Sequence, residues 1–227
     1  MKTTKNEINH NFYEKLAWKN KLFVCGVDEV GRGCLAGPLV VAATILPQNC
    51  KYPLLLDSKK ITANQRDTAF DWISKNCIYS VSYITPKIID EINIYQATIL
   101  AMNKAIIQLF GSISKEQFEK VKYLLIDAVP LQIPTSSKPQ TLEIYNFNYG
   151  ETYSKSIAAA SIVAKVIRDR LMTQINNIFP NYGFEEHKGY GTTKHLKALN
   201  IQEKSIIHRN SFLKNFKNKE ELQSSLF

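Results

Sequence analysis

The sequence predicts an α/β fold, in which helices pack on a sheet of short strands. Apolar runs rich in β-branched residues predict five strands, at residues 22–27, 39–46, 77–85, 122–126 and 141–147. Residues 86–110 carry apolar side chains at three- and four-residue steps, which predicts an amphipathic helix. A second long helix, rich in small residues, is expected from about Ser156 within residues 151–176. A chain of 227 residues can bury a sizeable core in one domain.

The first two strands flank the most informative stretch, residues 22–46. The first apolar run ends in two adjacent acids, Asp28 and Glu29, and a Gly/Pro turn leads to the second run. Burying two carboxylates costs several kcal/mol unless an arginine, backbone N–H groups or a metal ion compensates. Neighbouring strand residues point to opposite faces, so both acids can serve one site only where the strand ends or bulges. A tight turn with a solvated acid pair is the alternative.

The turn after the acids places Arg32 between two glycines, Gly31 and Gly33. Glycines there allow another backbone or the phosphates of a ligand to come close. Further along, two lysines precede a helix that Thr62 is expected to cap. Adjacent lysines are common in solvated loops, and the functional interpretation is a phosphate contact by Lys59.

Two further acids stand on other elements. Asp127 ends the fourth expected strand, and ligand sites of open α/β sheets gather at such strand ends, although a strand-end Asp is also a frequent turn former. Asp169 and Lys165 interrupt an otherwise apolar face of the last long helix. A surface ion pair would explain them only weakly, because a lysine four residues before the acid is the less favourable orientation.

A divalent cation would explain the four acids together. Clustered carboxylates repel and raise one another's pKa, and a cation relieves that repulsion. Oxygen ligands without a Cys or His set favour Mg²⁺ or Mn²⁺ over Zn²⁺. Four acids suit two ions about 3.5–4 Å apart, the arrangement for in-line displacement at phosphorus.

The charge of the chain predicts a polyanionic partner. The formal net charge is +9, which favours nucleic acid or an anionic membrane surface. No apolar run approaches the roughly 20 residues that span a bilayer, so we expect no membrane partner. Residues 185–219 combine basic side chains with Tyr190, Phe212 and Phe216, a pattern suited to phosphates and a stacked base or sugar. A charged surface helix would look similar.

The four cysteines form no C-x-x-C pair and have no histidine at zinc spacing. Cys25 lies in an apolar strand pattern and reads as a small core residue. We therefore expect a reducing, cytoplasmic location.

Five ordered motifs, spread over residues 22 to about 213, resemble one family. They read GVDEVGRGCLAGPLVVAA, DSKK, LLIDA, SIAAASIVAKVIRDR and HKGYGT. In this order and at these separations they resemble ribonuclease HII, the type 2 ribonuclease H. The resemblance implies a ribonuclease H-like fold, a mixed five-stranded sheet flanked by helices, with a helical C-terminal extension.

The resemblance also implies an activity. It implies a Mg²⁺- or Mn²⁺-dependent endonuclease that cuts the RNA strand of RNA–DNA hybrids. Such an enzyme also cuts 5′ of a ribonucleotide embedded in duplex DNA and leaves 3′-OH and 5′-phosphate ends. The cut would follow two-metal-ion hydrolysis, and the 2′-OH would distinguish RNA from DNA.

Individual residues match the motifs of the family. Its metal-binding acids fall on Asp28, Glu29, Asp127 and Asp169. Its glycine–arginine–glycine element falls on Gly31, Arg32 and Gly33, which would grip the 2′-OH and the next phosphate. Its junction-sensing tyrosine falls on Tyr190, and its phosphate contacts on Ser156 and Lys165. The chain departs from the family at Cys34, where Pro is common, and at Gly150-Glu151, where Gly-Asp is common.

The expected organisation is an N-terminal lead-in at 1–20, a catalytic domain at 21–180 and a basic C-terminal helical extension at 181–227 packed on it. We expect a monomer. Another two-metal nuclease or resolvase and a non-catalytic nucleic-acid-binding protein are the alternatives from the residues. A type 3 ribonuclease H is a third, but that family carries an extra N-terminal domain, and only about 21 residues precede the first motif.

Overall fold

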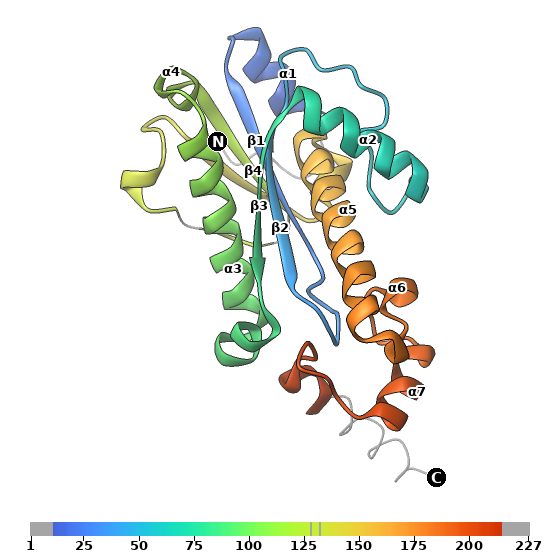
Figure 1. Cartoon of the computed structure of the whole chain (residues 1–227). Helices are drawn as coiled ribbons and strands as arrows, with labels where there is room; N and C mark the ends of the chain where they lie inside the picture. The colour runs from blue at the N-terminus through green and yellow to red at the C-terminus, as the bar shows by residue number, and fades with distance from the viewer. Residues whose placement is uncertain (1–10, 128, 132, 215–227) are drawn as a thin grey trace.

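The computed structural model describes residues 11–127, 129–131 and 133–214. Its centre is a five-stranded sheet in the order β3-β2-β1-β4-β5 (Figure 1). The strands are β1 (Phe23–Val30), β2 (Leu39–Ile45), β3 (Ile78–Ile84), β4 (Val121–Asp127) and β5 (Glu143–Phe147). β1, β2 and β3 are antiparallel neighbours, whereas β1–β4 and β4–β5 are parallel. The sheet is therefore mixed, which confirms the predicted fold class.

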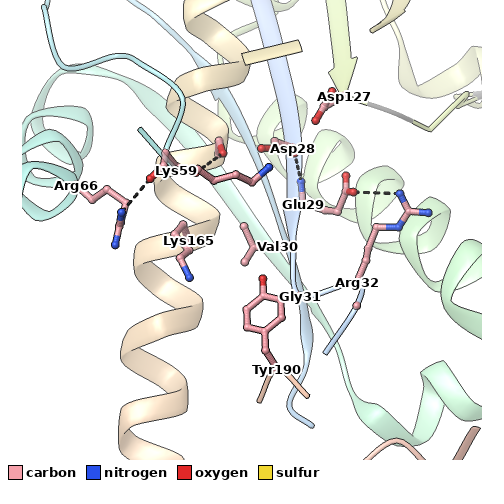
Figure 2. A pocket seen from close by; sticks show the side chains of 13 residues that line it. Asp28, Glu29, Val30, Gly31, Arg32, Lys59, Arg66, Asp127, Lys165 and Tyr190 are labelled. Atoms are coloured by element: carbon pink, nitrogen blue, oxygen red, sulfur yellow. Dashed lines mark hydrogen bonds and ion pairs between the residues drawn. The ribbon is translucent and has the colours of Figure 1, made fainter. Parts of the chain in front are cut away.

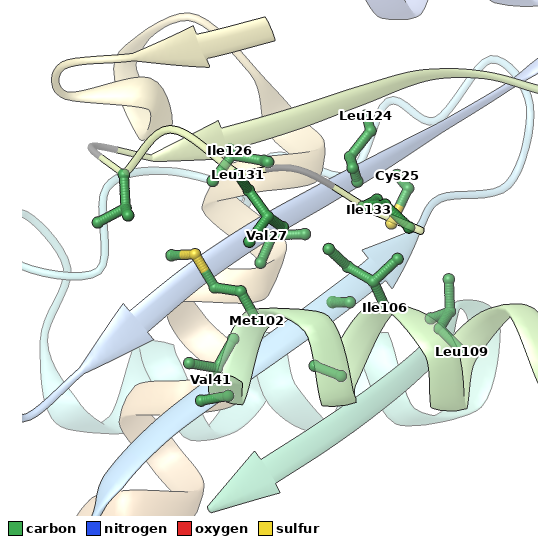
Figure 3. Packing of buried hydrophobic residues seen from close by; sticks show 14 of the residues in the cluster. Cys25, Val27, Val41, Met102, Ile106, Leu109, Leu124, Ile126, Leu131 and Ile133 are labelled. Carbon is green, nitrogen blue, oxygen red and sulfur yellow. The ribbon is translucent and has the colours of Figure 1, made fainter. Parts of the chain in front are cut away.

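Helices cover both faces of the sheet, with α3 on one side and α2 and α5 on the other (Figure 1). The helices of this layer system are α2 (Ala63–Asn76), α3 (Pro86–Ser112) and α5 (Lys155–Ile178). Strand β2 shows the consequence, because every residue in it is buried. Val41 and Ala43 pack in the cluster with α3 (Figure 3), and Val40 and Ala42 pack in the cluster with α5. A strand between two helical layers must be apolar on both faces.

Helix starts follow the capping residues of the sequence. Thr62 forms a capping box with Gln65 at the start of α2, as expected. Ser154 caps α5, so this helix begins at Lys155, one residue before the predicted position. Thr192 caps α7 (Thr193–Gln202), where its side chain accepts a hydrogen bond from His195 N. The short helix α4 (Lys115–Glu119) was not predicted.

The N-terminal helix α1 (Phe12–Lys19) is attached to the beginning of α5. Glu14, which is fully buried, accepts hydrogen bonds from Ser154 Oγ at 2.5 Å and from Ser156 N at 3.0 Å. Asn11 Oδ1 accepts one from Lys155 N at 3.0 Å. Side chains of α1 thus satisfy backbone N–H groups of the first turn of α5, which have no partner within the helix.

The described part of the C-terminal segment packs against α5. It contains the 3₁₀ turn η3 (Pro180–Tyr182), α6 (Phe184–His187) and α7. Phe184 and Met172, both fully buried, join these elements in one apolar cluster. Two further 3₁₀ turns, η1 (Thr135–Ser137) and η2 (Gly150–Thr152), lie before α5. No helix in the described residues is long and apolar enough to cross a membrane.

Candidate active site

A cavity of about 310 Å³ lies at the end of β1 and β4, beside α5 (Figure 2). It brings together all of the predicted site residues except Asp169 and Ser156. Those that line it are Asp28, Glu29, Gly31, Arg32, Gly33, Lys59, Asp127, Lys165 and Tyr190. Ser58, Arg66 and Ser161 complete its polar lining.

Strand pairing explains how both acids of β1 reach the cavity. The pairing of β1 with β4 stops at Val27, whereas the pairing with β2 continues to Val30. Asp28 and Glu29 therefore lie within β1 and not at its end, which differs from the expected strand end or bulge. Because β4 has already ended, the edge of β1 is open there, and both side chains reach the cavity.

Asp28 is buried, with 6% of its surface exposed. Its Oδ1 accepts a hydrogen bond from Glu29 N at 2.7 Å, and its side chain also bonds to Ser161. Ser161 Oγ lies 2.9 Å from Ser58 Oγ. Burial, then the charges of Glu29 and Asp127, raise the pKa of Asp28 well above its usual value.

Glu29 lies between a cation and an acid. Its Oε1 is 3.3 Å from Arg32 Nη1, and its Oε2 is buried without a partner among the described residues. Burial raises the pKa of Glu29 to about 7; Arg32 lowers it and Asp127 raises it. The arginine compensates for only part of the cost of burying this carboxylate.

Asp127 connects the end of β4 to the turn η2. Its Oδ1 accepts a hydrogen bond from Gly150 N at 2.8 Å. The next residue, Glu151, is 5% exposed, and its Oε2 is buried without a partner among the described residues. Burial raises the pKa of Glu151, and the charge of Asp127 raises it further. Lys59 Nζ lies 3.8 Å from Glu151 Oε1.

Glu151 is the residue that the sequence reasoning missed. The signal was present, because Gly150-Glu151 stands where the resembling family has Gly-Asp, and Glu conserves the carboxylate. Glu151 does not itself line the cavity, but the structure places its carboxylate beside Asp127, which does.

Asp169 does not line the cavity. It pairs with Lys165, with 2.8 Å between Nζ and Oδ1, and 21% of its side chain is exposed. Lys165 is the last residue of α5 that lines the cavity, and Asp169 lies four residues later, about 6 Å further along a helix that rises about 1.5 Å per residue. The structure therefore shows a partly buried ion pair at Asp169 and not the predicted convergence with the other acids.

Ser156 is also away from the cavity. It is fully buried, its N–H donates to Glu14, and its Oγ has no partner among the described residues. The carbonyl of Ser156 accepts a hydrogen bond from Thr44 Oγ1 at 2.7 Å, and the backbone of Ser156 packs against Gly26. This environment belongs to the interface between α5 and the sheet, and it differs from the predicted phosphate contact.

The opposite side of the cavity is formed by the glycine-rich loop and Tyr190 (Figure 2). Gly31 has φ +98°, a conformation that favours glycine, whereas a Cβ on Gly33 would meet nothing within 4 Å. The loop is thus open to a ligand at Gly33. The ring of Tyr190 is 41% exposed, with Lys165 Nζ 5.9 Å from its centre.

Three histidines support the segment that carries Tyr190. His195 Nδ1 donates to the Tyr190 carbonyl at 2.9 Å, and Ser205 N donates to His208 Nδ1 at 2.9 Å. These bonds leave the His208 Nε2–H to donate to His195 Nε2 across 3.0 Å, with both rings neutral. His187 stacks on His195, and burial lowers the pKa of His195 and of His208 to about 4.

Comparison with known proteins identifies the family. A model described as "Ribonuclease HII" matches residues 25–215. The chain belongs to the ribonuclease HII family. A ribonuclease HII of Bacillus mycoides (strain KBAB4) is 46% identical over 202 residues, covering 88% of this chain and 73% of the relative. One of Bacillus cereus (strain G9842) is 43% identical over 209 residues, covering 89% and 76%.

A solved structure supports the fold. The crystal structure of the ribonuclease H2 from Pyrococcus horikoshii OT3 superposes with a TM-score of 0.69 at 23% identity. The match covers 89% of this chain and 99% of the other. Membership in the ribonuclease HII family makes the chain a ribonuclease H, a metal-dependent hydrolase.

The residues of the cavity fit the divalent cation that a ribonuclease HII requires. The donors are carboxylate oxygens, which Mg²⁺ and Mn²⁺ prefer. Buried oxygens of Glu29 and Glu151 have no partner among the described residues. As they stand, no three Asp, Glu, His or Cys side chains in the described part are close enough together to hold an ion. The acids surround the cavity without converging on one point.

Proposed function

We propose that this ribonuclease HII cuts the RNA strand of RNA–DNA hybrids and cuts 5′ of single ribonucleotides in duplex DNA. One observation carries the proposal: buried acids whose repulsion is only partly compensated share one cavity with a basic, glycine-rich loop and an exposed tyrosine. A non-catalytic nucleic-acid-binding protein would gain nothing from acids that face the phosphates.

The proposed ligands of Mg²⁺ or Mn²⁺ are Asp28, Glu29, Asp127 and Glu151. Asp28 and Asp127 would be the central ligands, because hydrogen bonds already orient both carboxylates. Asp28 is oriented by Glu29 N and Ser161, and Asp127 is oriented by Gly150 N. Two bound ions would activate the attacking water and stabilise the leaving 3′-oxygen. Asp169 has no place in this set, because it is engaged with Lys165.

The remaining residues would bind and orient the nucleic acid. Gly33 leaves room for a nucleotide to approach the loop backbone, which can recognise the 2′-OH. Tyr190 would stack on the deoxyribose beyond the ribonucleotide. Lys59 and Lys165 would contact phosphates, since Lys59 is largely exposed and both line the cavity.

One chain supplies every residue of the proposed site, so a monomer suffices. We propose residues 21–180 as the catalytic domain and the segment after 180 as its extension; residues 1–10 and 215–227 lie outside the described part. The four cysteines are free, which agrees with a reducing cytoplasmic location.

A strand-specific cleavage assay tests the proposal. Labelled duplexes would be an RNA–DNA hybrid, a DNA duplex with one ribonucleotide and an all-DNA duplex, each with Mg²⁺ or Mn²⁺. We expect cleavage of the first two only, with 3′-OH and 5′-phosphate ends. Cleavage of the all-DNA duplex, or none of any duplex by a folded protein, would refute it.

A further inference from the structure

Two arginines are the largest fully buried side chains of the described chain, Arg168 on α5 and Arg209 after α7. Neither forms an ion pair with a carboxylate among the residues that the structure describes. Burying a guanidinium without an opposite charge is costly. All the hydrogen bonds that their side chains make there go to backbone carbonyls. The segments to which these carbonyls belong are the ones that the two arginines hold together.

Arg168 joins the glycine-rich loop to the segment before Tyr190. Its Nε donates to the Pro38 carbonyl at 3.0 Å and its Nη2 to the Ala36 carbonyl at 3.1 Å. Its Nη1 donates to the Lys188 carbonyl at 2.8 Å, and its Cζ lies 5.8 Å from the Tyr190 ring centre. The rigid, planar guanidinium group is thus hydrogen-bonded to two parts of the proposed substrate site at once, so it restricts the distance between them.

Arg209 holds the same loop from the other side. Its Nη1 donates to the Arg32 carbonyl at 2.9 Å, inside the glycine–arginine–glycine element. Its Nε and Nη2 both donate to the Gly37 carbonyl, at 3.1 and 2.9 Å. The backbone N–H of Arg209 also donates to the Leu35 carbonyl at 2.8 Å.

The glycine-rich loop and the segment before Tyr190 are in direct backbone contact. Leu35 N donates to the Gly189 carbonyl at 2.9 Å. A Cβ on Gly189 would lie 2.3 Å from the Ala36 carbonyl oxygen, and one on Gly31 would lie 2.3 Å from Arg168 Nε. Both glycines have positive φ, so each is required by its conformation as well as by its close neighbours.

We propose that Arg168 and Arg209 are positioning residues that set Tyr190 relative to Gly31–Gly33 and so control recognition of an isolated ribonucleotide. The inference rests on the proposed function. A single ribonucleotide offers one 2′-OH and one junction, so the loop must bind that 2′-OH at the same time as Tyr190 contacts that junction. A continuous RNA strand offers a 2′-OH at every position, so a shift between the two segments costs less there.

The test compares Arg168→Lys and Arg209→Lys, which keep the charge and lose the planar fork, with wild type. Arg170→Lys is the matched control, because Arg170 lies on the same helix but forms a surface pair with Asp67 at 2.8 Å. The readout is the ratio of kcat/KM on the single-ribonucleotide duplex to kcat/KM on the hybrid. This ratio does not depend on the fraction of folded enzyme.

We expect the ratio to fall about tenfold in each buried variant, since small misplacements of substrate-positioning groups carry large rate penalties. We expect it to stay unchanged in Arg170→Lys. An equal loss on both substrates would show a purely structural role and overturn the inference. If one variant does not fold, the other decides.

A double-mutant cycle with Tyr190→Ala sharpens the result. If the arginines act through Tyr190, Arg209→Lys should not change the ratio further in the Tyr190→Ala background. A full additional loss there would overturn the inference. Wild-type protein that cuts neither duplex would instead refute the proposed function, and this inference with it.

Discussion

Ionisable groups are buried in opposite ways on the two sides of the site, the acids at the cavity on one side and the groups behind the glycine-rich loop and Tyr190 on the other. On the carboxylate side, Asp28, Glu29 and Asp127 line the cavity and Glu151 lies beside Asp127, and buried oxygens of Glu29 and Glu151 have no partner among the described residues. On the C-terminal side, Arg168, Arg209 and the His195–His208 pair are hydrogen-bonded to carbonyls, to one another or to backbone N–H groups. Buried polar groups are stable when all their hydrogen bonds are made. The difference therefore indicates that the carboxylate side needs ligands from solution to satisfy its oxygens, whereas the C-terminal side is satisfied by the protein itself.

The largest expected effect comes from removing one acid of the carboxylate side. Asp28→Asn should lower kcat by about a thousandfold or more, the scale on which one electrostatic group acts in catalysis. It should also stabilise the metal-free protein, because one repelling charge disappears; a gain of about 1 kcal/mol would raise the Tm by roughly 2–4 °C. Cleavage assays and thermal unfolding in EDTA measure both. Near wild-type cleavage would remove Asp28 from the site.

The second prediction separates the two candidates for the fourth acid. Glu151→Gln should lower activity about a hundredfold and raise the metal concentration that gives half-maximal rate, the scale seen when a metal site is perturbed. Asp169→Asn is the matched control and should stay within about threefold, because Asp169 lies outside the cavity and a single partly buried ion pair contributes modestly. The reverse ranking would restore Asp169 to the site.

The third prediction uses the opposite pH responses of the two sides. Unfolded histidine titrates near 6.5, whereas His195 and His208 titrate at about 4 in the folded protein. Below about pH 6.5 the unfolded state therefore binds protons that the folded state does not, and their contribution to stability is lost as the pH falls towards 4. Between pH 7 and 5 the loss is about 2 kcal/mol per histidine.

Glu29 responds with the opposite sign. Its pKa is raised to about 7, so the folded state takes up a proton first and gains stability as the pH falls from above 7 towards the ordinary value of 4.5. Urea unfolding of the metal-free protein at several pH values resolves the two. The stability deficit of His208→Gln should shrink as the pH falls, and the stability advantage of Glu29→Gln should shrink as well. Parallel pH curves for wild type and either variant would contradict the assignment.

The smallest expected effect concerns Glu14, a buried carboxylate outside the cavity. Glu14→Ala removes the acceptor for Ser154 Oγ and Ser156 N at the start of α5 and should cost about 1–3 kcal/mol of unfolding free energy. Because Ser154 N donates to the Gly150 carbonyl, some loss of activity at limiting metal should follow. Lys120→Ala, which removes an exposed pair with Glu116, is the control and should change stability by less than about 1 kcal/mol. Equal effects in both variants would exclude a capping role for Glu14.

The elements that could be predicted from the sequence are those that local patterns decide. The five strands, the two long helices and the cap at Thr62 all follow from periodicity and turn chemistry. Prediction was weaker for the serines. Ser156 was expected to contact a phosphate, but the structure buries it between α5 and the sheet and places Ser58 and Ser161 at the cavity.

The sequence by itself determined the α/β class, the family and the acids of β1 and β4, because these depend on short-range pattern and on motifs in a fixed order. The tertiary structure alone decided which further acid approaches them and what holds the loop against Tyr190. The sequence analysis favoured Asp169, but in the structure α5 carries Asp169 one turn beyond Lys165, its last residue at the cavity, whereas the turn η2 brings Glu151 beside Asp127. The roles of Arg168 and Arg209 depend on backbone carbonyls, which every residue has, so no sequence pattern reveals them.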